Sequence, residues 1–487
     1  MYCTYNHDSC RRQVLKSPAF YISRESGGSL VEQIVQAVAS RIDDKLLRTG
    51  ARMPSIRQFA DEQGVSRFTV VEAYDRLVAK GYLESRRGAG FFVRERASML
   101  SQPAPVKPQT ADTQQMDVVW LVRNMLRQMP PHKMPGSGVL PHDWLDGDLV
   151  ANGLRAISRL NQNLLLHYGT QQGFLPLRQQ LQLKLAELEI AAAPEQILTT
   201  SGVTQALDLV AREFTHPGDT IFVDDPAWFL MFGSFAIFGT KVIGIPRLHD
   251  GPDVNKLAEL AAIHKPKLYI TNSVLHNPTS TSLSAAKAFQ ILKTAEQFNF
   301  LVVEDDVYCD LHPGSAVQSA TRIATLDQLN RVIYLGGFSK TLAANLRVGF
   351  IATSPELAIR LADRKMLSTL TTTEISERVV YKILSEGHYR KHVDRIRVRL
   401  DSVRDGICKR IESLGMKVDY RTPAGMFLWT ETGTDTNKLT EQALEQGYLL
   451  SPGSLFSPNQ LPSTRMRINI ASMSDPGVWD FLERAMR

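Results

Sequence analysis

The chain has 487 residues and a mass of 54.4 kDa, more than one small domain requires, so at least two domains are expected. It contains no apolar run of about 18 residues and no apolar stretch after N-terminal charges, which predicts a cytoplasmic protein without a membrane span or secretion signal. The four cysteines, Cys3, Cys10, Cys309 and Cys408, are scattered without CxxC spacing, which argues against a disulfide framework or a zinc site.

The net charge of +6 is unevenly distributed along the chain. Residues 1–100 hold 16 Lys and Arg against 11 Asp and Glu, a net of +5, whereas the remaining 387 residues hold 40 against 39, a net of +1. This placement favours a nucleic-acid partner for the N-terminal region, although a chance surplus on a solvated surface would give the same balance.

Composition along the chain predicts four regions. The segment 97–116 is rich in Pro, Ser, Thr and Gln without an apolar period, which predicts an exposed linker. The linker separates a folded domain over 28–96 from a longer domain over 117–487. An N-terminal extension over 1–27 resembles neither, and no function is assigned to it.

The domain over 28–96 is predicted to contain three helices and a β-hairpin. Apolar residues recur at every fourth position between residues 30 and 42, which predicts an amphipathic helix. Ser55 and Gly64 bound a short second helix, and Ser66 and Gly81 bound a third. The stretch "YLESRRGAGFFV" then predicts a hairpin with a basic turn. This order is typical of a winged helix-turn-helix.

The predicted DNA contacts follow from the geometry of that motif. The helix capped by Ser66 would be the recognition helix, whose first residues enter the major groove. There Arg67 and Thr69 can bond base edges or phosphates. The other predicted contacts are Arg57 near the start of the second helix and Arg86, Arg87 and Gly88 in the wing. Any one of these arginines alone could equally be a solvated surface charge.

The whole segment "PSIRQFADEQGVSRFTVVEAYDRLVAKGYLESRRGAGFFV" closely resembles the DNA-binding domain of the GntR family. The resemblance implies that the N-terminal domain binds double-stranded operator DNA.

Beyond the linker, apolar runs alternate with helical patterns. The runs are "TIFVDD", "LYITNS", "FLVVEDD", "RVIYLGG" and "GFIATS". Such runs, bounded by turns and separated by helices, predict a mostly parallel sheet covered on both faces, an α/β/α architecture. Because ligands bind at the carboxyl ends of the strands in such sheets, the polar residues there are candidate site residues.

Five clusters of candidate residues lie at the predicted strand ends. They are Gly202, Val203 and Thr204 at a helix start; Trp228; Asn277; Asp305 with Tyr308; and Ser339, Lys340 and Arg347. The helix start offers N–H groups to an anion, and a carboxylate at the dry end of a sheet requires a cation. Each cluster alone also has an ordinary explanation, such as a helix cap, a core tryptophan or a turn.

In this order, the clusters resemble the aminotransferases of pyridoxal-phosphate fold type I over residues 117–487. The resemblance implies that the cofactor is pyridoxal 5'-phosphate and that Lys340 forms the internal aldimine with it. Asp305 would keep the ring nitrogen protonated, Tyr308 and Asn277 would bond the ring O3′, and Trp228 would cover the ring. A buried, usable amine and a protonated ring nitrogen are what this chemistry requires.

The same resemblance implies how the rest of the ligand is held. The helix start at 202–204 and Arg347 would hold the phosphate, and Ser339, directly before Lys340, would also bind the cofactor. Tyr168 in "HYGTQQGF" would reach the phosphate of a neighbouring subunit, which implies a homodimer. Arg467 in "MRINIAS" would bind the α-carboxylate of an amino compound through its bidentate guanidinium.

Two positions depart from the family pattern. Gly337 stands where the family has a Ser or Thr that binds the phosphate, and Ala344–Asn345 replace the usual Pro-Gly before "LR". Both changes predict a looser hold on the phosphate. Gly337 is the main reason to favour a sensor over an enzyme.

Together the two domains resemble the MocR subfamily of GntR-type transcription regulators. The resemblance implies a bacterial homodimer whose DNA-binding domains are exchanged head-to-tail. An amino-group effector would form an aldimine in the aminotransferase-like domain and bias the winged helices through the linker. Two alternatives stay open: a working aminotransferase with secondary DNA binding, and a regulator for which the cofactor itself is the signal. The effector, the operator and the sign of regulation are not predicted.

Overall fold

The computed structural model describes residues 22, 28–94, 118–126, 129–160, 162–314 and 320–487. The predicted linker over 97–116 lies outside the described residues, as does the predicted extension over 1–27 apart from Ile22. The chain divides into two compact units, residues 1–113 and 114–487.

The first unit is a winged helix-turn-helix. Its elements are α1 (Leu30–Asp43), α2 (Ile56–Gln63), α3 (Arg67–Ala79), β1 (Leu83–Arg86) and β2 (Gly90–Val93). Serine hydroxyls cap all three helices, as Ser66 does for α3 by accepting from the Thr69 N–H, and they satisfy amide groups that a helix start leaves free. Gly64 ends α2 in the left-handed conformation with φ 64°. The predicted order of elements is confirmed.

A single core holds this small unit together. Phe59 of α2 packs edge-on against Tyr74 of α3, with ring centroids 5.6 Å apart. Tyr74 also packs against Phe91 of β2 and donates its hydroxyl to the Pro54 carbonyl at 3.2 Å. The buried aromatic rings therefore tie both turn-linked helices to the wing.

The second unit is built on an eight-stranded sheet. In spatial order its strands are β3 (Ile197–Thr200), β10 (Gly349–Ala352), β9 (Val332–Gly337), β8 (Leu301–Asp305), β7 (Leu268–Thr271), β4 (Thr220–Asp225), β5 (Lys241–Leu248) and β6 (Gly251–Pro252). The strands from β9 to β5 run parallel, whereas β10 is antiparallel to both of its neighbours and β6 is antiparallel to β5. The prediction of a mostly parallel sheet is confirmed.

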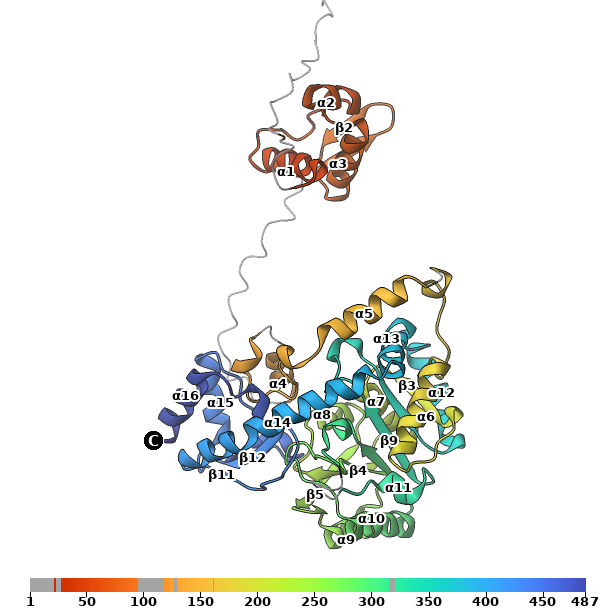
Figure 1. The fold of residues 1–487 in the computed structure, drawn as a ribbon, viewed down its shortest axis with the longest axis vertical. Helices are drawn as coiled ribbons and strands as arrows, with labels where there is room; N and C mark the ends of the chain where they lie inside the picture. Colours follow the sequence, from red (N-terminus) through yellow and green to blue (C-terminus); the bar gives the residue numbers. More distant parts are fainter. Residues whose placement is uncertain (1–21, 23–27, 95–117, 127–128, 161, 315–319) are drawn as a thin grey trace, which may run out of the picture. The chain divides into compact units, whose positions relative to one another are not determined.

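Helices cover both faces of this sheet (Figure 1). The helices of the whole unit are α4 (Val118–Met125), α5 (Gly147–Ser158), α6 (Leu175–Glu187), α7 (Val203–Phe214), α8 (Leu230–Ile237), α9 (Val254–His264), α10 (Ala285–Phe298), α11 (Ile323–Asp327), α12 (Pro355–Thr369), α13 (Glu374–Ser385), α14 (His388–Ser413), α15 (Thr436–Glu445) and α16 (Pro476–Met486). Short 3₁₀ turns cover Pro131–Lys133, His142–Trp144, Gln162–Leu165, Pro194–Gln196, Cys309–Leu311, Ala344–Leu346, Gly453–Phe456 and Ile470–Ser472.

Two hydrophobic cores lie on opposite faces of the sheet. On one face Ile221, Ile270 and Val303 pack with residues of α7, α8 and α14. On the other face Phe222 and Tyr269 pack with residues of α6, α9, α10 and α13. Successive strand residues thus alternate between two cores, which explains why the strands are apolar throughout.

A smaller antiparallel sheet completes the unit. It consists of β11 (Lys417–Val418), β12 (Phe427–Glu431) and β13 (Arg465–Asn469), with β12 between the other two. The long helix α14 leads from the large sheet toward this smaller one (Figure 1). No helix among the described residues is both long enough and apolar enough to cross a membrane.

Candidate functional site

The predicted site residues of the second unit gather around one cavity. The cavity is lined by Val203, Thr204, Trp228, Asn272, Asn277, Asp305, Val307, Tyr308, Ser339, Lys340 and Arg347. These residues follow the carboxyl ends of β4, β7, β8 and β9 or lie at the start of α7, where the crossover connections of a parallel sheet leave room for a ligand. Residues that are far apart in the sequence therefore meet here, because each follows the carboxyl end of a strand or starts the helix beside it.

Lys340 follows β9 and points its amine into this site. Its Nζ donates to the Gly138 carbonyl at 2.9 Å and lies 5.8 Å from the centre of the Tyr308 ring. Burial, together with the nearby Arg467 charge, lowers the pKa of Lys340 to about 8, although the Asp305 carboxylate opposes the change. A larger fraction of uncharged amine is therefore available near neutral pH than for a surface lysine, as a nucleophile requires.

Asp305 ends β8 and is only 7% exposed. Its Oδ1 accepts the Val307 N–H at 3.2 Å, and burial raises the pKa of Asp305 to about 6. It forms no ion pair with any residue that the structure describes. A buried carboxylate in this state lacks a cationic partner, and a protonated ring nitrogen would supply one.

An anion cradle lies at the start of α7. Gly202 is the residue before the helix, with φ 79°, and no described side chain caps the helix start. Arg347 donates from Nη2 to the Ser201 carbonyl at 2.9 Å, and its Nη1 is 3.5 Å from Ser339 Oγ. A Cβ on Gly202 would come within 2.6 Å of Arg347 Nη2, so only glycine leaves this space open. The helix N-terminus and Arg347 together suit a phosphate.

Arg467 joins the site from β13 and is 1% exposed. Its Nη1 donates to Asn277 Oδ1 at 2.8 Å and its Nη2 to the Gly136 carbonyl at 2.6 Å. Burial lowers the pKa of this guanidinium to about 10. Asn277 in turn donates to the Tyr308 hydroxyl at 3.3 Å, so Asn277 connects Arg467 to the cavity wall.

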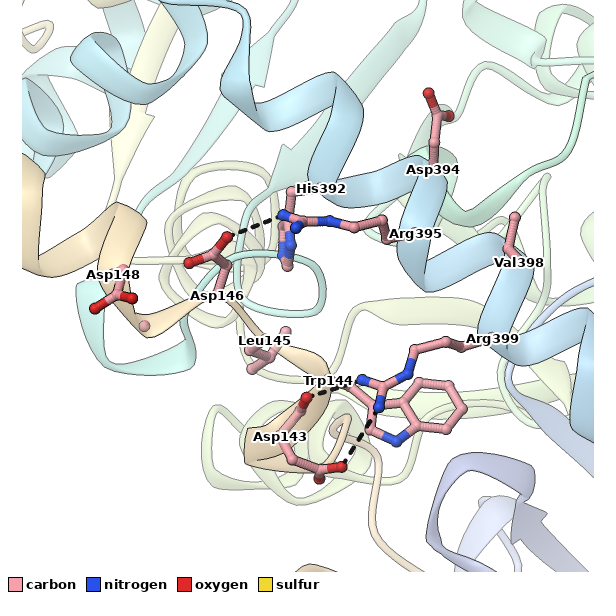
Figure 2. Close-up of a pocket in the computed structure, with 11 residues that line it drawn as sticks. Asp143, Trp144, Leu145, Asp146, Asp148, His392, Asp394, Arg395, Val398 and Arg399 are labelled. Carbon is pink, nitrogen blue, oxygen red and sulfur yellow. Dashed lines mark hydrogen bonds and ion pairs between the residues drawn. The ribbon is translucent and has the colours of Figure 1, made fainter.

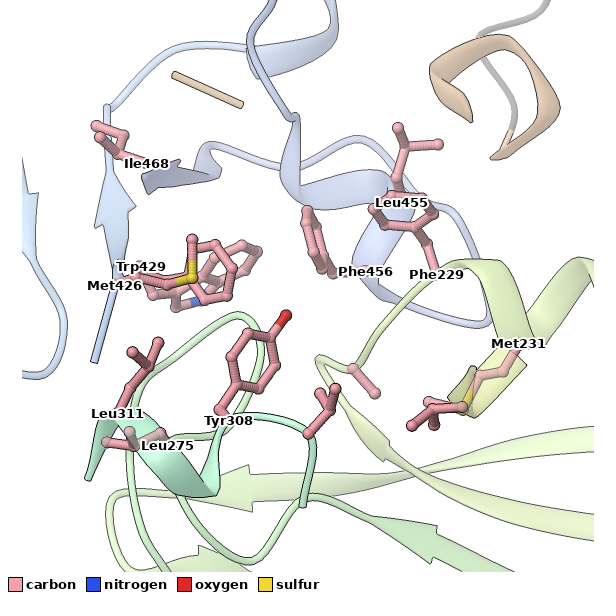
Figure 3. Packing of buried hydrophobic residues seen from close by; sticks show 14 of the residues in the cluster. Phe229, Met231, Leu275, Tyr308, Leu311, Met426, Trp429, Leu455, Phe456 and Ile468 are labelled. Carbon is pink, nitrogen blue, oxygen red and sulfur yellow. The ribbon is translucent and has the colours of Figure 1, made fainter. Parts of the chain in front are cut away.

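Aromatic rings surround this polar set. The Arg467 guanidinium lies 4.5 Å from the centre of the Phe427 ring and 4.9 Å from that of Phe456. Tyr308 packs edge-on against Phe427, and Figure 3 shows it facing Trp429 and Phe456 of the C-terminal region. The rings exclude water, which strengthens the polar interactions inside.

Tyr168 is the one predicted cofactor residue that does not approach this cavity in its own chain. Its side chain is 81% exposed. Leu166, Leu367 and Leu370 are also exposed apolar side chains of this unit. The role of Tyr168 in a neighbouring subunit stays a prediction.

Sequence reasoning missed three backbone and side-chain partners of the site. Asn272 donates its amide to the Asp305 carbonyl at 2.6 Å, and it directly follows β7, so the strand-end rule would have found it. The carbonyls of Gly136 and Gly138 accept from Arg467 and Lys340. Their only sequence signal was the turn-forming "PGSG" beyond the linker.

A second and larger groove lies apart from the cavity (Figure 2). It runs between residues 143–148 and α14, and Arg395 pairs there with Asp146 at 2.9 Å. None of the predicted site residues is among its lining residues. His392, which also lines the groove, bonds through Nε2 to the Thr341 carbonyl at 2.7 Å, one residue after Lys340.

The predicted DNA contacts lie on the surface of the first unit. Arg57 and Arg67 are exposed in the first turns of α2 and α3. Arg86 stacks over Phe92 at 4.5 Å and pairs with Glu84, while Arg87 and Gly88 form the exposed turn of the wing, with φ 73° at the glycine. Their contact with DNA stays a prediction.

The donor set of the cavity fits pyridoxal 5'-phosphate. An unpaired buried carboxylate suits the ring nitrogen, and the Tyr308–Asn277 pair suits the ring hydroxyl. The cradle beside Gly202 suits the phosphate, and the half-buried Trp228 suits the ring face. Fold and site together define a pyridoxal-phosphate-binding protein of fold type I that also carries a winged helix.

Comparison with known proteins agrees with this class. The chain belongs to the aminotransferase class I and II family, whose model matches residues 136–484. Residues 30–93 match the model of the bacterial regulatory proteins of the gntR family.

Individual relatives cover one or both units. The chain is 32% identical over 330 residues to aromatic-amino-acid aminotransferase 1 of Thermococcus litoralis, covering 66% of this chain and 78% of that one. It is 27% identical over 460 residues to the uncharacterized HTH-type transcriptional regulator YdfD of Bacillus subtilis, covering 91% and 93%. Kynurenine aminotransferase of Pyrococcus horikoshii, solved in complex with PMP, superposes with a TM-score of 0.68 at 27% identity, covering 76% and 92%.

Proposed function

We propose that this protein is a pyridoxal-phosphate-dependent transcription regulator of the MocR subfamily. It binds operator DNA through its winged helix and senses an amino compound at the Lys340 site. The observation that carries the proposal is the presence, in one chain, of a cavity that fits the cofactor and of a winged helix-turn-helix. Relatives such as YdfD, an HTH-type transcriptional regulator matched over 91% of this chain, support it.

Each residue of the site has a proposed task. When bound, pyridoxal 5'-phosphate supplies an electrophilic carbonyl carbon and an electron-withdrawing ring. Asp305 holds a proton at the ring nitrogen, and Lys340 offers a partly uncharged amine. Arg467 orients the carboxylate of the amino compound, and Asn277 keeps the guanidinium in place. Arg347 and the start of α7 hold the phosphate.

The geometry at Gly337 supports a sensor over an enzyme. Gly337 ends β9, and a Cβ there would lie 3.3 Å from Val203 Cγ2 and 3.4 Å from the Val348 carbonyl oxygen. The position therefore supplies no hydroxyl to the phosphate and has little space for one. A site with one phosphate ligand fewer fits ligand-linked regulation better than rapid turnover.

A second candidate function is a working aminotransferase with an accessory DNA-binding unit. The lowered pKa of Lys340 and the buried Arg467 favour it, because both are what catalysis on an amino acid requires. Relatives named aminotransferases, such as that of Thermococcus litoralis, share this unit.

We also propose a cytoplasmic homodimer with head-to-tail exchange of the DNA-binding units. Tyr168, Leu166 and Leu367 are large apolar side chains exposed to solvent, and a second copy would cover them. In that arrangement Tyr168 would complete the phosphate site of the neighbouring subunit. Sedimentation of the wild type and Tyr168→Phe, with cofactor affinity measured for both, tests it: Tyr168→Phe should bind cofactor more weakly as an intact dimer.

One experiment tests the regulatory function. The wild-type protein first selects a DNA duplex from a random library. This duplex is then titrated with cofactor-loaded wild type, with cofactor-free wild type and with Lys340→Ala. The matched control is Lys293→Ala, because Lys293 is an exposed lysine of α10. Candidate amino compounds are then added while the visible absorbance and keto-acid release are followed.

The expected result is DNA affinity that changes with the amino compound for the wild type and Lys293→Ala but not for Lys340→Ala. A ligand can shift the equilibrium only through unequal affinity for two states, so indifference of DNA binding to cofactor, ligand and Lys340→Ala would refute sensing. Sustained keto-acid release would favour the aminotransferase.

A further inference from the structure

The recognition helix α3 exposes a large aromatic side chain to solvent. Phe68, its second residue, is 77% exposed, whereas Phe59 and Tyr74 of the same unit are fully buried. Val71, one turn further along, is 37% exposed. Because residues three apart lie on the same side of a helix, Phe68 and Val71 form a small apolar strip on the outer face of α3.

The core of the unit does not account for this strip. The inward face of α3 consists of Val70, Ala73, Tyr74 and Leu77. Phe68 is not among the residues that pack against that core. Its position on the helix is therefore available for an external partner.

The surroundings of Phe68 indicate what that partner is. Arg67 precedes it, is exposed and forms no ion pair with a residue in the described part of the chain. Beside Phe68, the hydroxyl oxygens of Ser66 and Thr69 lie 2.7 Å apart and share a hydrogen bond. The start of α3 thus offers an unpaired cation, two hydroxyls and an apolar ring within four residues.

This combination matches the major groove of DNA. Phosphates and guanine edges accept bonds from arginine, and the 5-methyl group of thymine is the apolar feature that the groove presents. A wholly apolar protein partner would leave Arg67 without an acceptor. Phosphate contacts alone would leave the Phe68 ring in water.

We propose that Phe68 is a specificity-determining residue that packs on the 5-methyl group of a thymine next to the base or phosphate contacted by Arg67. The inference rests on the proposed DNA-binding function and adds one base preference to it. It assigns Phe68 to sequence readout.

The test removes one methyl group from DNA. A duplex is selected from a random library with the full-length, cofactor-loaded wild type, and each thymidine of the enriched sequence is replaced in turn by deoxyuridine. Base pairing is unchanged, so a loss of affinity reports the methyl contact alone. The wild type should lose about 3- to 5-fold in affinity at one thymine of each half-site, the factor that burial of one methyl group supplies.

Variants of Phe68 identify the residue that makes the contact. Phe68→Ala should lose this sensitivity to deoxyuridine, while Phe68→Leu should retain part of it because its side chain remains apolar. Alanine is a good helix former at an exposed position, so the fold is expected to persist. Phe289→Ala, which removes an exposed ring from α10 of the other unit, should behave as the wild type.

The outcomes separate this proposal from the function on which it rests. An enriched sequence that tolerates deoxyuridine at every position would overturn the Phe68 contact and leave DNA binding intact. Sensitivity that persists in Phe68→Ala would also overturn it. Failure to enrich any sequence would overturn both proposals.

Discussion

Replacing Asp305 by asparagine removes a buried charge and keeps the shape of the side chain. The Val307 N–H can still donate to the amide oxygen, so the local structure is preserved. We expect Asp305→Asn to stabilise the cofactor-free protein at neutral and alkaline pH. We expect it at the same time to weaken cofactor binding, because the ring nitrogen loses its anionic partner.

The size of the stabilisation follows from the pKa of Asp305, which burial raises from 3.8 to about 6. Between these values the folded state binds the proton more tightly than the unfolded state does, so the free energy of unfolding falls as the pH rises. The loss is complete above about pH 6 and amounts to about 3 kcal/mol. Asparagine cannot ionise and avoids this loss.

Urea unfolding at several pH values measures the difference. All five tryptophans (Trp120, Trp144, Trp228, Trp429 and Trp479) lie in the second unit, so their fluorescence reports that unit alone. Wild type and Asp305→Asn should be about equally stable near pH 4 and should diverge as the pH rises. Asp480→Asn, which changes an exposed carboxylate of α16, is the control. Parallel pH profiles for wild type and Asp305→Asn would refute the reasoning.

Three further predictions concern the same site. The rate of cofactor capture by Lys340 should reach half its maximum near pH 8, because the amine loses its proton there; stopped-flow absorbance that shows no such pH dependence would contradict this. Gly202→Ala should weaken binding of pyridoxal 5'-phosphate about 10-fold or more, because the added Cβ would lie 2.6 Å from Arg347 Nη2 in the phosphate cradle. Binding of phosphate-free pyridoxal should weaken far less. Equal losses of affinity for the two compounds in equilibrium titrations would argue against the cradle. Ser280→Ala should lower the free energy of unfolding by about 1–3 kcal/mol, because Ser280 Oγ donates to the carbonyl of Phe427 and accepts from its N–H. Ser280→Gly should lose less stability, because glycine adopts the φ of 55° at this position without strain. Denaturation curves that rank the two variants the other way would refute this.

Sequence reasoning located much of the candidate site because the rule behind it is topological. Lys340, Asp305 and Asn277 follow strands that run parallel, and parallel strands carry their carboxyl ends to one edge of the sheet. The positions of these residues at one cavity were therefore predictable without any knowledge of side-chain packing.

Other features depend on packing between distant segments, which local pattern does not encode. The apolar runs give no strand direction, so the antiparallel setting of β10 was not foreseen. Arg247 of β5 is a cation between apolar residues, yet in the fold it is buried and bonds Asp224 Oδ2 at 2.7 Å. The same Asp224 Oδ2 lies 3.5 Å from Nε2 of His276, the residue directly before Asn277.

The backbone carbonyls of Gly136 and Gly138 compete with incoming ligands for the side chains of Arg467 and Lys340. Arg467 and Lys340, the two groups proposed to receive a carboxylate and an aldehyde, already donate to these carbonyls at 2.6 and 2.9 Å. A carboxylate that binds Arg467 therefore replaces the Gly136 carbonyl as hydrogen-bond acceptor, and capture of an aldehyde by Lys340 first breaks the hydrogen bond to Gly138, so each event costs one existing hydrogen bond. Asn469 of β13 donates to the Ser137 and Val139 carbonyls, so residues 136–139 stay attached to β13 when Arg467 and Lys340 change partners. A ligand at Arg467 or Lys340 would thus release one hydrogen bond to residues 136–138, while Asn469 still holds Ser137 and Val139 in place.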